Sequence, residues 1–169
     1  MKKIMVRNGA FETNSSSTHS ITMCNESDYI KWKNNELYFY EEENRFVTPK
    51  ERKEIIRRNV FRSLFVNVDW KRNVIIYQDV DKQKEIAFEN YGDMCAKVDA
   101  LVTLDALDRV TDQDIADYEE KWVDGRFDIP CSYQDYYNNV SEEYETFKEE
   151  FVTPNNDKVI SFGYYGNDY

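Results

Sequence analysis

The chain has little glycine, proline or cysteine, a single histidine and no long apolar run. Five glycines and three prolines in 169 residues exclude collagen-like and linker-type proteins. No stretch approaches the ~18–20 consecutive apolar residues of a membrane span, and the opening residues hold no apolar run typical of a secretory signal. We therefore expect no membrane partner. Three scattered cysteines without a CxxC pair indicate a reducing compartment, so we predict a cytoplasmic protein.

Several cofactor and metal signatures are also missing. One histidine and three distant cysteines offer no short ligand pair for zinc. The sequence has no Walker A segment, no dinucleotide-binding fingerprint and no G-x-S-x-G motif. The acidic runs at 41–43 and 79–81 have the ligand type that Mg²⁺ prefers, and we interpret them as solvated faces or turns. We expect no metal and no cofactor.

Aromatic residues are abundant, and they argue against disorder. Thirteen Tyr, ten Phe and three Trp supply enough apolar area for a core. The length suits one domain over 1–169. β-Branched and aromatic runs predict strands at 20–24, 36–40, 74–77 and 159–162. We predict an α+β fold, in which both chain ends form a small, mostly antiparallel sheet with helices packed on it.

A basic helix is predicted at about 48–65. Thr48 is a cap, Pro49 fits the first helical position and Glu51 completes a capping box. Ile56, Val60 and Leu64 follow at spacings of four and fall on one face. The segment 45–72 holds nine basic and three acidic side chains.

An acidic helical region is predicted at about 89–151. Residues 89–150 hold eighteen acidic and five basic side chains. Tyr144, Phe147 and Phe151 continue the helical spacing at its end. The net charge of the whole chain is −11, which excludes a generally basic nucleic-acid coat protein. The acidic carboxylates form either a solvated surface or an imitation of the phosphate array of a nucleic acid.

The most polar segment lies at 7–20 and contains the histidine. It reads Arg7-Asn8-Gly9-Ala10-Phe11-Glu12-Thr13-Asn14-Ser15-Ser16-Ser17-Thr18-His19-Ser20. Serine and asparagine runs form turns whose hydroxyl and N–H groups hydrogen-bond locally or surround a phosphate. We expect a polar site loop here.

This segment holds the residue types that metal-independent RNA transesterification needs. Glu12 would act as base, His19 as acid, and Arg7 would stabilise the charged phosphorane. Substrate would be bound by residues of the loop and of the basic helix: Asn14, Ser15, Ser16, Ser17, Lys53 and Arg57. The structural alternative is a Ser/Asn-rich turn with a surface histidine, next to an ordinary amphipathic helix with a basic outer face.

The same segment resembles the R-x-G-x-F-E-T-N-S-S-S-x-H-S opening of small proteins that bacteriophages and mobile elements of Firmicutes encode. The resemblance covers about the first twenty residues of the chain. It implies that Arg7, Glu12, Asn14, Ser15–Ser17 and His19 act together. By analogy, it also implies a counter-defence protein such as an anti-CRISPR, working in the host cytoplasm.

Three functional hypotheses stay open. The chain inhibits a host RNA-guided nuclease of the Cas9 type by acting on or near its guide RNA with the N-terminal site, as a ribonuclease. Alternatively, it is purely a binding inhibitor whose acidic region imitates a nucleic acid. The third, a nucleotide-handling enzyme, rests only on the Ser-rich loop as a phosphate site.

Overall fold

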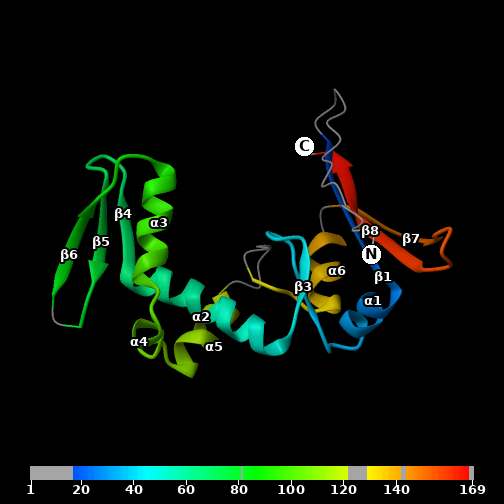
Figure 1. Ribbon diagram of the computed structural model, residues 1–169, viewed down its shortest axis with the longest axis horizontal. Helices are drawn as coiled ribbons and strands as arrows, with labels where there is room; N and C mark the ends of the chain where they lie inside the picture. Colours follow the sequence, from blue (N-terminus) through cyan, green and yellow to red (C-terminus); the bar gives the residue numbers. More distant parts are fainter. Residues whose placement is uncertain (1–16, 81, 122–128, 142–143, 168–169) are drawn as a thin grey trace. The chain divides into compact units, whose positions relative to one another are not determined.

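The computed structural model describes residues 17–80, 82–121, 129–141 and 144–167 (Figure 1). The fold class is α+β, as predicted. The chain divides into two compact units, Met1–Arg52 with Asp124–Tyr169, and Lys53–Val123. Each unit has its own sheet, and each is described by itself. The single domain over 1–169 stays a prediction.

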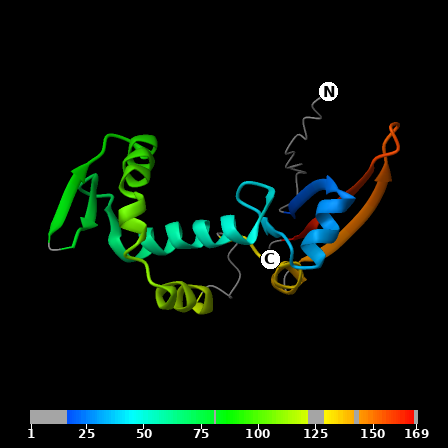
Figure 2. The ribbon, with the colours of Figure 1, turned by 60° about the horizontal axis from the view of Figure 1, so that its bottom comes forward.

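The first unit contains the sheet that the two chain ends were predicted to form. Its strands are β1 (Ser17–Asn25), β8 (Lys158–Asn167) and β7 (Glu145–Val152), in the order β1-β8-β7 and antiparallel throughout. Helices α1 (Glu26–Lys33) and α6 (Tyr133–Ser141) lie beside this sheet (Figures 1 and 2). A two-stranded ribbon, β2 (Tyr38–Tyr40) with β3 (Arg45–Val47), completes the unit.

An aromatic core joins the two helices to one face of this sheet. Trp32 of α1 is fully buried, and its ring centroid lies 5.0 Å from that of Phe162 on β8 and 5.3 Å from that of Tyr136 on α6. The indole N–H of Trp32 donates to the carbonyl oxygen of Cys131 at 3.2 Å. Burial of several large rings in one cluster explains why so many aromatics are spread along the chain.

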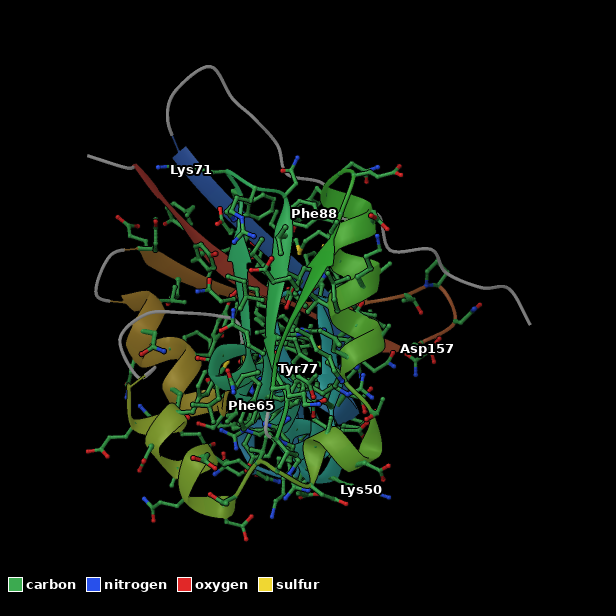
Figure 3. All side chains as sticks on the ribbon, turned by 90° about the vertical axis from the view of Figure 1, so that its left-hand side faces the viewer. Lys50, Phe65, Lys71, Tyr77, Phe88 and Asp157 are labelled. Atoms are coloured by element: carbon green, nitrogen blue, oxygen red, sulfur yellow. The ribbon has the colours of Figure 1, made fainter. Side chains whose placement is uncertain are left out.

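The second unit pairs a helix with another small antiparallel sheet. Its elements are α2 (Pro49–Phe65), which begins in the first unit, then β4 (Val66–Asp69), β5 (Val74–Gln78), β6 (Gln83–Ala87), α3 (Tyr91–Leu101), α4 (Leu104–Leu107) and α5 (Asp112–Lys121). Ile75 of β5, Phe88 after β6, and Met94 and Val98 of α3 form its core; Phe88 is labelled in Figure 3.

The start of α2 confirms the predicted capping box. The backbone N–H of Thr48 donates to the Glu51 carboxylate at 2.8 Å, and the N–H of Glu51 donates to Oγ1 of Thr48 at 3.3 Å. Ile56 and Val60 are buried as predicted, whereas Leu64 is 51% exposed. A helix has about 3.6 residues per turn, so residues spaced by four move gradually off one face. The buried face of α2 therefore includes Phe61 and not Leu64.

The predicted end of the acidic helical region is wrong. Residues 145–152 form β7, not a helix. Phe147 and Phe151 are four apart, a spacing that also places two residues on one face of a strand. The spacing of the aromatic residues therefore fits a helix and a strand equally well. The pairing with β8 makes this segment a strand.

Candidate functional site

The polar segment 7–20 lies mostly outside the described residues. Five predicted site residues fall there: Arg7, Glu12, Asn14, Ser15 and Ser16. Ser17 and His19 belong to β1, and the strand pairing places His19 opposite Tyr165. The expected loop is therefore wrong at its end, because residues 17–20 are already in a strand.

The sheet brings His19, Tyr165 and Glu145 into one cross-strand row on β1, β8 and β7. The Tyr165 hydroxyl donates to Oε2 of Glu145 at 2.6 Å. This hydrogen bond and the negative charge of Glu145 raise the pKa of Tyr165. Tyr165 and Glu145 were not predicted as site residues, because the register between distant strands leaves no local signal in the sequence.

Glu41, directly after β2, has a partly buried carboxyl group that contacts β1. Its Oε1 accepts hydrogen bonds from the Tyr164 hydroxyl at 2.9 Å and from Oγ of Ser20 at 3.4 Å. Its Oε2 is buried and has no hydrogen-bond partner in the described part of the chain. Burial outweighs the two hydrogen bonds and raises the pKa of the carboxyl group. An ionisable group thus lies beside the strand into which the polar segment leads.

This carboxyl group gives a stability prediction with a definite sign. A folded-state pKa above the unfolded value of about 4.3 means that the folded chain binds the proton more tightly. The free energy of unfolding of the native chain should therefore fall relative to Glu41→Gln as the pH rises from about 4 through the folded-state pKa, because the unfolded state ionises first. Urea unfolding of both chains across this range measures the difference. A difference that stays constant or rises with pH would contradict the assignment.

The carboxylates of the two short acidic runs have separate protein partners. Tyr40 donates to Glu42, Arg45 pairs with Glu43, and Lys84 pairs with Asp79. Among the described residues, no three His, Cys, Asp or Glu side chains are grouped to hold a metal ion.

Two of the cysteines are poor nucleophile candidates. Burial raises the pKa of both Cys24 and Cys131 to about 12, so neither thiol ionises near neutral pH. Cys131 also contacts the backbone carbonyl of Phe39. A cysteine-based active site at these two positions is therefore disfavoured.

The cations of α2 are largely paired with carboxylates. Nζ of Lys53 lies 3.1 Å from Oδ1 of Asp112, and Arg57 lies 3.9 Å from the same oxygen. Other pairs continue along the helix: Arg58 with Glu54 at 2.7 Å and Arg62 with Asp99 at 2.6 Å. The two predicted substrate-binding residues do lie together, one turn apart. However, the carboxylate between them lowers the attraction that this helix face offers to RNA.

Several exposed carboxylates of the second unit lie in or between the helices α4 and α5. Asp114 caps α5 by accepting hydrogen bonds from the N–H and hydroxyl groups of Thr111. Ile115 of the same helix is buried. Four further carboxylates are exposed and pair with no cation in the described ranges: Asp105, Asp108, Asp117 and Glu120. Nearby, the Arg109 guanidinium is held on the rings of Phe65 and Tyr77, both labelled in Figure 3, and donates to the Tyr77 hydroxyl at 3.0 Å. The exposed surface of α4 and α5 is therefore negative.

No protein-family model, curated protein or solved structure matches the chain. Within the described ranges, no helix combines the length and apolar character needed to cross a membrane.

Proposed function

We propose that the chain is a counter-defence protein of a phage or mobile element that inhibits a host RNA-guided nuclease of the Cas9 type by binding near its guide RNA. The observation that carries this proposal is a contrast in charge pairing. Four cations of α2 are paired with carboxylates, whereas Asp105, Asp108, Asp117 and Glu120, in or between α4 and α5, are exposed and pair with no described cation. Such a surface attracts a basic protein and repels free RNA. The N-terminal resemblance supplies the phage context.

The acidic surface of α4 and α5 acts as the imitation of a nucleic acid. A nuclease that holds a guide and a target strand needs a basic channel for their phosphates. The carboxylates lie on helices that are already folded. Binding them therefore costs less conformational entropy than binding a flexible acidic segment. The polar segment 7–20 then contacts the RNA or the protein next to it.

The salt dependence of binding tests this proposal. We expect the affinity of the purified chain for a Cas9–guide RNA complex to fall steeply as ionic strength rises, because charges across the interface are screened. Titration at several salt concentrations measures it. Absence of binding at low salt would refute the proposal, and salt-independent binding would refute its electrostatic basis.

Cleavage of the guide RNA is the second candidate function. The observation that favours it is the strand register, which places His19, Tyr165 and Glu145 in one row, and residues of these types transfer protons in phosphodiester chemistry. In this version Glu12 or Glu145 is the base, His19 the acid, and Arg7 holds the phosphate. An acidic protein repels free RNA at long range, so cleavage would depend on prior docking to the nuclease.

A further inference from the structure

The sheet of the first unit has a second face that neither α1 nor α6 covers. Strand pairing arranges its positions in cross-strand rows: Ile21 with Gly163 and Phe147, Met23 with Ser161 and Glu149, and Asn25 with Val159 and Phe151. The alternate residues of β8, Ile160, Phe162 and Tyr164, belong to the aromatic core. We call the set Ile21, Met23, Phe147, Phe151, Val159 and Tyr165 the outer face.

The outer face is apolar where a solvent-facing sheet is normally polar. Antiparallel sheets with one wet side alternate apolar and polar residues along each strand. Here Ile21, Met23, Phe151 and Tyr165 are 44%, 45%, 45% and 40% exposed, whereas Thr22 on β1 and Tyr164 on β8, which point to the other face, are buried. Contiguous exposed apolar patches mark interaction sites.

Two small residues of β8 lie at the centre of this face. A Cβ atom on Gly163 would lie 3.2 Å from Cε1 of Phe147, so the Phe147 ring lies over the glycine. Ser161, in the next row of β8, is also small and is 6% exposed. An apolar sheet face is a surface on which helices pack in layered structures.

The charges of the face select the occupant. The ionised side chains described in its rows are Glu145 and Glu149, both on β7 and both exposed. Two copies placed face to face would bring carboxylates and a net charge of −11 per chain together, which opposes self-association. A helix that carries Lys or Arg beside an apolar stripe would bury the apolar residues and pair with both carboxylates.

We propose that the outer face binds a basic amphipathic helix of the partner protein. This inference rests on the proposed function for the identity of the partner, the nuclease, and it adds a second contact surface to that of α4 and α5. Met23 and Phe151 are its apolar anchors, and Glu145 and Glu149 orient the basic side of the helix.

The test compares the native chain with a Met23→Gln/Phe151→Gln variant. Both side chains are nearly half exposed, so the variant should keep its fold, which circular dichroism and thermal unfolding check. The control is Ile30→Gln on α1, where the replaced side chain is 48% exposed in the same unit. Two probes are used. The first is the Cas9–guide RNA complex. The second is a synthetic helical peptide of Leu and Lys, and its control is a peptide with Glu in place of each Lys.

We expect the double variant to bind both the complex and the Leu/Lys peptide at least about tenfold more weakly, with the Ile30→Gln chain unchanged and the Leu/Glu peptide not bound. Equal peptide binding by all three chains would overturn the inference. Self-association of the native chain that the double variant loses would assign the face to a second copy and also overturn it. Peptide binding that depends on the face, without binding of the complex, would refute the proposed function alone.

Discussion

Replacing Gly163 by alanine should cost at least about 3 kcal/mol of folding free energy. A Cβ atom at this position would lie 1.8 Å from the backbone carbonyl oxygen of Ser20 and 2.8 Å from its carbonyl carbon. Overpacking usually costs about 1–3 kcal/mol because side chains give way. Here the obstacle is the backbone of β1, so either the strand shifts or its pairing with β8 breaks.

The consequence reaches beyond stability, because β1 connects the sheet to the polar segment. Loss of pairing around Gly163 would release Ser20 from its contact with Glu41 and separate His19 from Tyr165. Hydrogen exchange should show faster exchange in β1 than in α3. Denaturant unfolding gives the energy.

Gly92 offers a matched control with the opposite expected sign. It lies in α3, and its added Cβ would meet only Oδ1 of Asn90, at an ordinary contact distance of 3.5 Å. Alanine is favoured over glycine in helices by about 0.5–1 kcal/mol, so Gly92→Ala should be neutral or stabilising. If the Gly163→Ala chain is as stable as the Gly92→Ala chain, then β1 does not lie as close to Gly163 of β8 as the structure places it.

Reversing two carboxylates of α5 should reduce the affinity for the nuclease complex by at least about a hundredfold at low salt. Asp117→Lys/Glu120→Lys changes two exposed side chains that pair with no described cation. Asp112 and Asp114 are left intact, because they pair with Lys53 and cap α5. The expected loss combines two broken attractions with two new repulsions across the interface.

A second double charge reversal distinguishes an effect of where the charges lie from an effect of the net charge. Glu36→Lys/Glu89→Lys changes the net charge by the same amount at exposed positions that belong to neither α4 nor α5. This control should lose affinity only modestly, through long-range attraction. Equal losses in the two variants would mean that net charge alone governs binding, and that α5 is not an interface.

The sequence predicted the locally encoded elements well. The capping box at Thr48, the buried positions Ile56 and Val60 and the strand at 74–77 all follow from neighbouring residues, and the structure confirms them. The α+β class and the sheet from both chain ends were also correct. These features depend on periodicity and on preferences of short segments.

Features set by distant pairing were missed. β7 was predicted as a helix because the spacing of Phe147 and Phe151 fits both periods. The contact of Tyr165 with Glu145 and the burial of Glu41 depend on strand register and on packing between segments far apart in the sequence. Local residue patterns carry no signal for either, and the apolar outer face is visible only after the register is known.

The site residues show the same division. Lys53 and Arg57 lie on one helix, as their spacing implied, but the carboxylate of Asp112 between them comes from a segment more than fifty residues away. Their proposed role in binding RNA stays a prediction, weakened by that pairing. The joint action of Arg7, Glu12 and His19 also stays a prediction.

Target-DNA cleavage by a Cas9–guide RNA complex, measured with increasing amounts of the native chain, tests the central claim most directly. The account predicts that cleavage stops near equimolar chain and that the guide RNA is recovered at full length. Recovery of a shortened guide RNA would instead show that the chain inhibits the nuclease by cleaving the guide, and not by binding alone. Cleavage at an undiminished rate with excess chain at low salt would contradict the account.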